Sequence, residues 1–251
     1  MITYEFPVNE KIRTFLRLES LYKRAKVYNN HNDSENHHAG LLTIFEILEV
    51  TGRSELKSEV MQELEKQKNH LIQLKDNPSV EPSTADAIID EIEHSSQLLL
   101  HSQGKAGQEI RQNDWLASIK QRTSIPGGVC QFDLPSYHYW LSSDSESRKK
   151  DLERWLQPFE GLASGIVIIL KILRKSSSPE IITASNGNFQ KTLSGKIAQL
   201  IQIKIASPSN LIPEVSANKY LLNVRFTIAG EQSKKQTQEK VNFELGFCNL
   251  L

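Results

Sequence analysis

The hydrophobic period of this chain changes near Pro179 from that of helices to that of strands, and this change limits the folds open to it. From Asn9 to Lys175, apolar residues recur mostly at the three- and four-residue spacing of helices that face a core. After Pro179 they alternate in three segments separated by polar loops. The alternating positions are Ile197, Ile201, Ile203 and Ile205, then Tyr220, Leu222, Val224 and Phe226, then Val241, Phe243, Leu245 and Phe247. The sequence therefore predicts an α+β fold in which helices precede an antiparallel sheet with one solvent-exposed face.

Both ends of the helical part need separate treatment. Residues 2–6 alternate in polarity, which predicts a short strand stopped by Pro7, and Asn9 is a suitable N-cap for the helix that follows. The segment 159–175 contains a β-branched run that would also suit a buried strand. We favour a helix there, because Leu162, Ile166 and Leu173 share one helical face.

Composition describes an ordinary globular chain of one large domain or two small ones. Of the 251 residues, 38% are hydrophobic and 24% charged, and thirty basic residues balance thirty acidic ones. A net charge of zero argues against a general nucleic-acid binder. The N-terminus lacks a signal-peptide layout, and the apolar run 166–170 is too short to span a membrane. Two distant cysteines give no disulfide framework, so we expect a cytoplasmic protein with reduced thiols.

The stretch SIPGGVCQFDLPSYHYWL, from Ser124 to Leu141, combines a cysteine with a histidine and invites a catalytic interpretation. The alternation in Val129–Leu134 predicts a strand whose apolar face holds Cys130 together with Phe132. A thiol on that face behaves as a small hydrophobic group, so we expect a buried structural cysteine and not a nucleophile. Asp133 would cap the next helix, and the glycines would form the turn from the helices into the sheet.

Other patterns that could indicate chemistry are weak. There is no phosphate-binding glycine loop, and GLASG at 161–165 has neither the spacing nor the context of a nucleophile elbow. His31, His37 and His38 could hold a metal, but without a nearby cysteine or regular spacing a solvated loop is the better interpretation. We therefore expect no catalytic residue, metal or cofactor.

Basic residues give the sequence its clearest functional hint. The first helix is strongly basic, Lys120 and Arg122 precede the Pro-Gly-Gly turn, and Lys219 and Arg225 lie on the polar face of one strand. These cations could line an anion-binding groove or simply be scattered surface charges. The spacing does not choose between an acidic peptide and a phosphate backbone as the ligand.

Three long motifs narrow the choice through a resemblance. YEFPVNEKIRTFLRLE at 4–19, SIPGGVCQFDLP at 124–135 and VNFELGFC at 241–248 resemble the ZapD family of bacterial cell-division proteins over the whole chain. The resemblance implies a non-enzymatic protein of the cytoplasm at the midcell division site. It would bind the C-terminal tail of the tubulin-like GTPase FtsZ and, as a symmetric homodimer, cross-link and bundle FtsZ protofilaments to stabilise the Z-ring.

The family's matching motifs also imply which residues form a basic groove for the tail. The best candidates are Arg13 and Arg17 in the first helix, Arg122 before SIPGG, and His138 after FDLP. Weaker candidates are Arg225 in VRF, Arg53 between helices, and Lys219 on the sheet. Leu221 stands where relatives would carry a basic residue, which weakens the contribution expected from the sheet.

The resemblance further implies a helical domain of residues 9–123 and 135–176 and a β-strand domain of residues 1–8, 124–134 and 177–251. No cofactor, nucleic acid or membrane insertion is expected. The alternative functions are nucleic-acid binding through the basic first helix and, less favoured, a cysteine-dependent enzyme.

Overall fold

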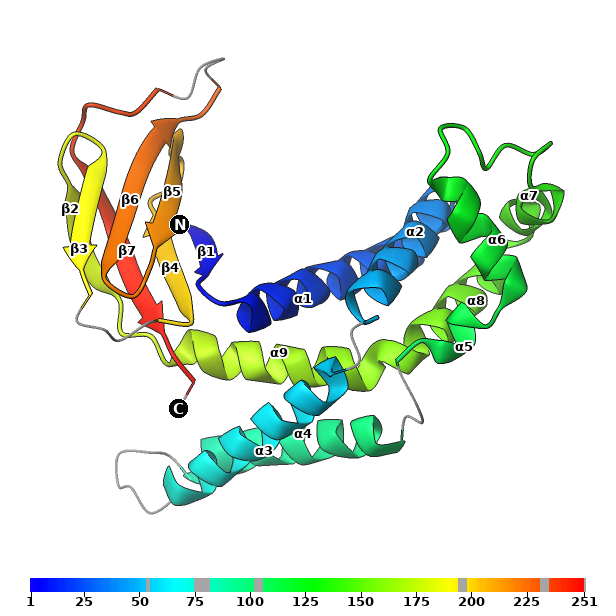
Figure 1. Ribbon diagram of the computed structural model, residues 1–251, viewed down its shortest axis with the longest axis horizontal. Coiled ribbons are helices and arrows are strands. Elements are labelled where there is room, and N and C mark those ends of the chain that lie inside the picture. The colour runs from blue at the N-terminus through cyan, green and yellow to red at the C-terminus, as the bar shows by residue number, and fades with distance from the viewer. Residues whose placement is uncertain (53–54, 75–81, 102–105, 194–197, 231–234, 251) are drawn as a thin grey trace. The chain divides into compact units, whose positions relative to one another are not determined.

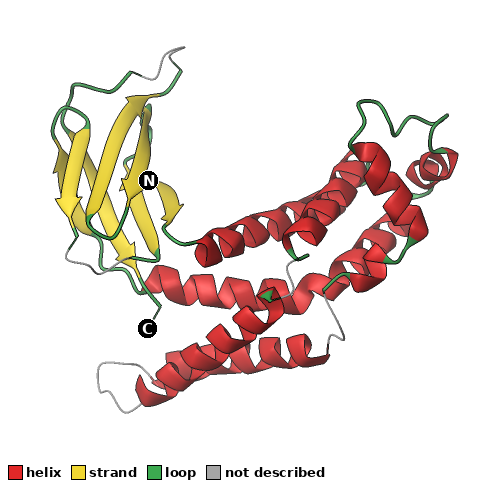
Figure 2. Ribbon diagram, viewed as in Figure 1, coloured by secondary structure: helices red, strands yellow, loops and turns green. Residues whose placement is uncertain are grey.

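A computed structural model of the chain describes residues 1–52, 55–74, 82–101, 106–193, 198–230 and 235–250. It divides into two compact units, described separately below: the strand unit, Met1–Thr14 with Leu170–Leu251, and the helical unit, Phe15–Ile169. Figures 1 and 2 show the α+β architecture.

The helices are α1 (Glu10–Asn29), α2 (Ser34–Val50), α3 (Leu56–Leu74), α4 (Pro82–His101), α5 (Gln108–Arg111), α6 (Asp114–Thr123), α7 (Pro135–Ser142), α8 (Ser145–Leu156), the 3₁₀ helix η1 (Gln157–Phe159) and α9 (Glu160–Lys175). The strands are β1 (Ile2–Pro7), β2 (Glu180–Ala184), β3 (Asn188–Thr192), β4 (Leu200–Ile205), β5 (Leu211–Ala217), β6 (Leu221–Ile228) and β7 (Val241–Cys248).

The strand unit is built from two antiparallel sheets. One has the order β1-β4-β7-β2 and the other β3-β6-β5, so the three alternating segments found in the sequence are divided between two sheets. Their apolar faces form one core, in which Ile203, Val224 and Phe243 are buried. The prediction of antiparallel strands is confirmed, including the N-terminal strand, whereas the expected single sheet is wrong. Alternation shows which face of a strand is buried but not which strand is its neighbour.

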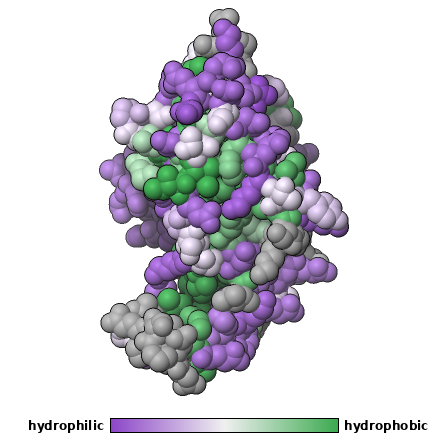
Figure 3. Space-filling view, turned by 90° about the vertical axis from the view of Figure 1, so that its left-hand side faces the viewer, coloured by the Kyte–Doolittle hydropathy of each residue, from purple (hydrophilic) through white to green (hydrophobic). Residues whose placement is uncertain are grey.

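The hairpin between β2 and β3 follows from local sequence. Asn186 and Gly187 both have positive φ, 51° and 64°, as the two-residue turn of such a hairpin requires. Figure 3 shows the molecule from the left-hand side of Figure 1. On this face hydrophilic side chains cover most of the visible surface and enclose a smaller hydrophobic patch. The strand unit does expose single apolar side chains, with Ile181 at 82%.

In the helical unit, α9 packs closely on the hairpin of α3 and α4 through two glycines four residues apart. A Cβ on Gly161 would lie 3.0 Å from the backbone nitrogen of Leu99 in α4. A Cβ on Gly165 would lie 2.8 Å from Val60 Cγ1 in α3. The GLASG motif therefore serves helix packing, since only residues without a side chain allow this approach.

The helical stretch Ser145–Lys175 is long and apolar enough by composition to span a membrane, but 56% of its most apolar window is buried inside the protein. Ile166, Ile169 and Leu173 are fully buried. Its apolar composition is thus accounted for by its place in the core, and the prediction of a helix over 159–175 is confirmed.

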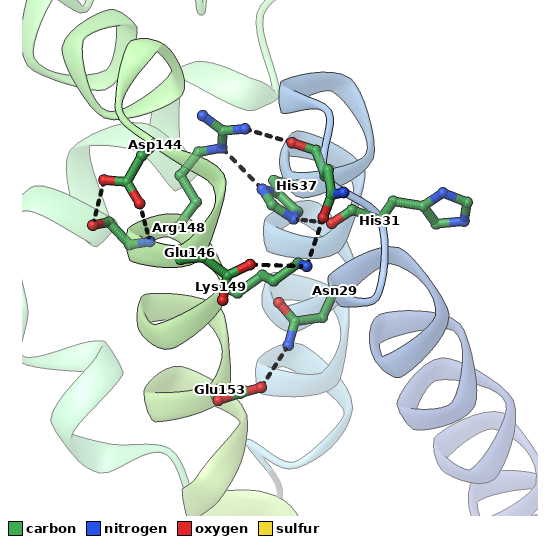
Figure 4. Close-up of polar contacts among 10 residues, drawn as sticks. Asn29, His31, His37, Asp144, Glu146, Arg148, Lys149 and Glu153 are labelled. Carbon is green, nitrogen blue, oxygen red and sulfur yellow. Dashed lines mark hydrogen bonds and ion pairs between the residues drawn. The ribbon is translucent and has the colours of Figure 1, made fainter.

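A buried arginine, Arg148 of α8, connects this helix with the start of α2, as Figure 4 shows, and also with the end of α7. The Nε–H of Arg148 donates to Nδ1 of His37 (2.9 Å). Its two Nη groups donate to the carbonyl oxygens of Asn32 (2.8 Å), Leu141 (2.9 Å) and Ser143. Because Nδ1 of His37 accepts a hydrogen bond, the ring proton lies on Nε2, which donates to the carbonyl of His31 (2.7 Å). The expected solvated loop is therefore wrong for two of its three histidines, because His37 and His38 lie in α2 and His37 is fully buried.

The structure contradicts two predictions for the segment 124–134, the strand over Val129–Leu134 and the burial of Cys130. The segment forms consecutive turns inside the helical unit, between α6 and α7, and contains no strand. Cys130 is exposed, and Phe132 is 79% exposed. A six-residue alternation is too short to separate a strand from a run of turns, because turns also place successive side chains in different directions. Leu134 and not Asp133 holds the N-cap position of α7, with Pro135 in the first turn as predicted.

Lowering the pH should destabilise the protein through His37. Burial, the largest cause, and the charge of Arg148 lower the pKa of His37 below its ordinary 6.5. The unfolded chain therefore binds more protons than the folded one, and the free energy of unfolding should fall as the pH drops below about 6.5. One histidine contributes at most about 1.4 kcal/mol per pH unit.

Urea unfolding between about pH 7.5 and 5.5 measures this effect. Glutamine at position 37 does not bind a proton in this pH range, so the variant His37→Gln should lose less stability than the wild type across the same interval. His38, whose pKa burial also lowers, is present in both proteins and cancels in the comparison. Equal losses would contradict the role given to His37.

The two thiols should differ in reactivity. Cys130 is exposed, whereas Cys248 is buried and burial raises its pKa, which leaves less of the reactive thiolate. A short exposure of the native protein to an alkylating reagent, read by mass spectrometry, should modify Cys130 before Cys248. The variant Cys130→Ser should then stay almost unlabelled. Rapid labelling of Cys248 in the folded protein would contradict this structure.

Candidate partner-binding surface

Helix α6 positions Arg122, one of the predicted site residues, in its last turn. The side chain of Asn113 caps the helix by accepting from the backbone N–H of Leu116 (3.0 Å), and Leu116 and Ile119 bury one face. Arg122, in the last turn, is exposed, and its Nη1 lies 3.6 Å from Oδ1 of Asp133. This ion pair joins the end of α6 to the turns that follow.

The turns of 124–134 are held by backbone hydrogen bonds, such as the one from the N–H of Leu134 to the carbonyl of Cys130 (3.0 Å). They present apolar side chains to solvent: Ile125 is 48% exposed and Phe132 79%. Large apolar groups in solvent next to a cation are typical of contact surfaces.

An aromatic cluster packs against the buried side of α7. Tyr137 and Trp140 are buried and stack with ring centroids 5.7 Å apart, against Trp115 and Trp155. The hydroxyl of Tyr137 lies 2.6 Å from Nδ1 of His38. Burial raises the pKa of Tyr137 above its ordinary range and lowers that of His38, so both groups stay uncharged near neutral pH.

The opposite side of α7 presents His138 and Tyr139, the latter 79% exposed. We call the exposed residues Arg122, Ile125, Phe132, His138 and Tyr139 the α6–α7 surface. It combines a guanidinium, an imidazole and apolar groups, which suits an acidic peptide that also has apolar side chains. Within the described part of the chain, no group of three or more histidine, cysteine or carboxylate side chains is arranged to hold a metal ion.

The structure places the other predicted residues in different parts of the molecule. Arg17 is exposed on α1, whereas Arg13 pairs with Glu10 one turn earlier (2.5 Å). Lys219 lies over the ring of Tyr220 (4.8 Å), and Arg225 stands opposite Glu214 in the register of β6 and β5. Arg53 lies outside the described residues.

These residues divide between the two units. Arg17, Arg122 and His138 belong to the helical unit, while Arg13, Lys219 and Arg225 belong to the strand unit. Each unit is a separate body here, so a single groove formed by both sets stays a prediction.

Sequence reasoning missed the apolar members of the α6–α7 surface. A signal for one of them was present, because Tyr137 and Trp140 have the three-residue spacing of a buried helical face and leave Tyr139 outside it. For Phe132 no such signal existed, because its exposure depends on the turns that replace the expected strand.

Comparison with known proteins agrees with the motifs. The model of the ZapD family, described as a cell division protein, matches residues 16–225. A cell division protein ZapD from Dechloromonas aromatica (strain RCB) is 48% identical over the full length of both chains. Proteins of the same name from Aromatoleum aromaticum and Azoarcus sp. (strain BH72) are 45% and 43% identical, and cover all of this chain and 98% and 100% of their own. This chain belongs to the ZapD family of cell division proteins.

Proposed function

We propose that this protein is a non-enzymatic division factor that binds the C-terminal tail of FtsZ and stabilises the Z-ring. Its place of action would be the cytoplasm at midcell. The observation that supports this proposal most is family membership over the whole chain, together with exposed cations in motifs of that family.

The α6–α7 surface is the part of the helical unit that we propose as a tail contact. Arg122 and His138 supply hydrogen-bond donors for carboxylates, and Phe132 and Tyr139 supply apolar contact area. Arg17 on α1 would add a further cation. We propose weaker contributions from Arg13, Arg53, Arg225 and Lys219. The pair of Arg13 with Glu10 is closer (2.5 Å) than that of Arg122 with Asp133 (3.6 Å), and Arg225 faces Glu214 across the strands.

Bundling requires two tail sites in one particle. We propose that the protein acts as a homodimer, so that each copy holds the tail of a different filament. Two modest sites linked in this way bind much more tightly than one, because the second contact is intramolecular. No cofactor, nucleic acid or membrane insertion enters this mechanism.

Co-sedimentation with FtsZ filaments tests the proposal. The wild type should pellet with polymerised FtsZ and not with filaments that lack the C-terminal tail. Arg17→Glu and Arg122→Glu should each weaken binding about tenfold or more, because a charge-assisted hydrogen bond to a carboxylate is replaced by repulsion. Added salt should weaken the wild-type interaction as well.

Lys150→Glu is the matched control, because Lys150 is an exposed cation of α8 outside the proposed surface. It should pellet like the wild type, and circular dichroism should show the same helix content in all variants. Equal pelleting with tailless filaments would exclude the tail as the ligand. Full affinity in both arginine variants would exclude the α6–α7 surface and Arg17 as its site.

A further inference from the structure

The helical unit contains a pocket of about 350 Å³ between α2, α5 and α6 that none of the predicted site residues lines. Its apolar wall consists of Phe45, Leu48, Ile110 and Leu116, each at most 5% exposed. Ala117, Lys120 and Gln121 of α6 line it from the side nearer to solvent, and Arg111 of α5 completes it. The volume is at the small end of the range for ligand pockets, about 300–1,000 Å³. It suits one or two apolar side chains better than a cofactor.

The guanidinium of Arg111 is fixed at the rim. Its Nη1 donates to the carbonyl of Ala106 and its Nη2 to that of Leu48, both at 2.7 Å. These hydrogen bonds hold the group in place without neutralising its charge, because carbonyl oxygens are uncharged acceptors. A cation that is already positioned loses little conformational freedom when it meets a carboxylate.

Glu49, the neighbour of Leu48 at the end of α2, shows which chemistry this rim accepts. Its carboxylate takes a hydrogen bond from Lys120, and this contact, with a smaller effect of Arg111, lowers the pKa of Glu49. Both side chains of the pair are partly exposed, 68% for Glu49 and 36% for Lys120. Exposed ion pairs of this kind contribute little to stability, so another carboxylate can replace Glu49 at low cost.

We propose that this pocket binds an apolar side chain of the FtsZ tail, while a neighbouring carboxylate of the tail replaces Glu49 on Lys120. This inference rests on the proposed function and adds a second contact to it on α6, the helix whose last turn holds Arg122. An apolar wall beside two cations fits a segment that has both an apolar side chain and a carboxylate. A purely apolar ligand would leave both cations without a partner, and a simple anion would make no contact with the apolar wall.

Filling the pocket tests the first half of this proposal. Ala117→Phe places a ring where the tail side chain would lie, without changing a charge or a buried core residue. Ser118→Phe adds the same ring to the next, exposed position of α6, which does not line the pocket. Binding of a fluorescent peptide of the FtsZ tail, measured by anisotropy, should weaken at least tenfold in Ala117→Phe, which is about 1.4 kcal/mol. Ser118→Phe should stay within about twofold of the wild type.

The second half predicts a gain in affinity, which damage to the fold would not produce. Glu49→Gln removes the internal carboxylate, so the peptide should bind about threefold more tightly, a change well inside the range of exposed charge pairs. Glu46→Gln is the matched control, because it removes the same charge from α2 at a residue whose partner is Arg24 (2.5 Å). It should change the affinity less.

The outcomes separate the two proposals. If the wild type binds the peptide but Ala117→Phe does so equally well, the pocket is not a site, and the proposed function stands. If both phenylalanine variants weaken binding equally, the effect is general and the pocket is again excluded. If the wild type binds neither the peptide nor FtsZ filaments, both proposals are wrong.

Discussion

The buried guanidinium of Arg148 in α8 connects this helix with α2, with the segment before α2 and with the end of α7. Removing a charged group from water is costly unless its hydrogen bonds are satisfied, and Arg148 satisfies them with three backbone carbonyls and one imidazole. In the described part of the chain, no carboxylate pairs with it. The carbonyl groups come from the connection between α1 and α2 and from the end of α7. Together with the aromatic cluster around Tyr137 and Trp140, this side chain therefore fixes the end of α7, the helix that carries His138 and Tyr139.

Much of the architecture could be predicted from the sequence, because local signals and tertiary packing agree there. Asn9 caps α1 by accepting from the N–H of Ile12 (2.8 Å), and Asn186 and Gly187 form the expected hairpin turn. The division of the strands into two sheets could not be predicted, since it depends on contacts between distant segments. The segment 129–134 failed for a different reason: its short apolar alternation had no second signal to support it.

The candidate site was harder to predict than the fold. A pattern of cations shows where charge lies along the chain, but exposure and pairing decide whether that charge is available. Arg13 and Arg122 looked equivalent in the sequence, yet one pairs within its own helix and the other with a turn eleven residues away. The burial of Arg148 and the position of Arg111 have no sequence signal, because most of the groups that hold these two guanidinium groups are backbone carbonyls, which every residue carries.

The two glycines of α9 also determine how α3 and α4 align along it. Leu99 and Val60 can approach α9 closely only where a side chain is missing, and such places occur at Gly161 and Gly165. A screw movement of α9 by one residue, about 1.5 Å along its axis with a rotation of about 100°, would bring Leu162 to the place of Gly161 at the backbone of α4. The two glycines thus fix the position of α9 along α3 and α4. They exclude alternative alignments of the helices that an interface made only of leucines would tolerate.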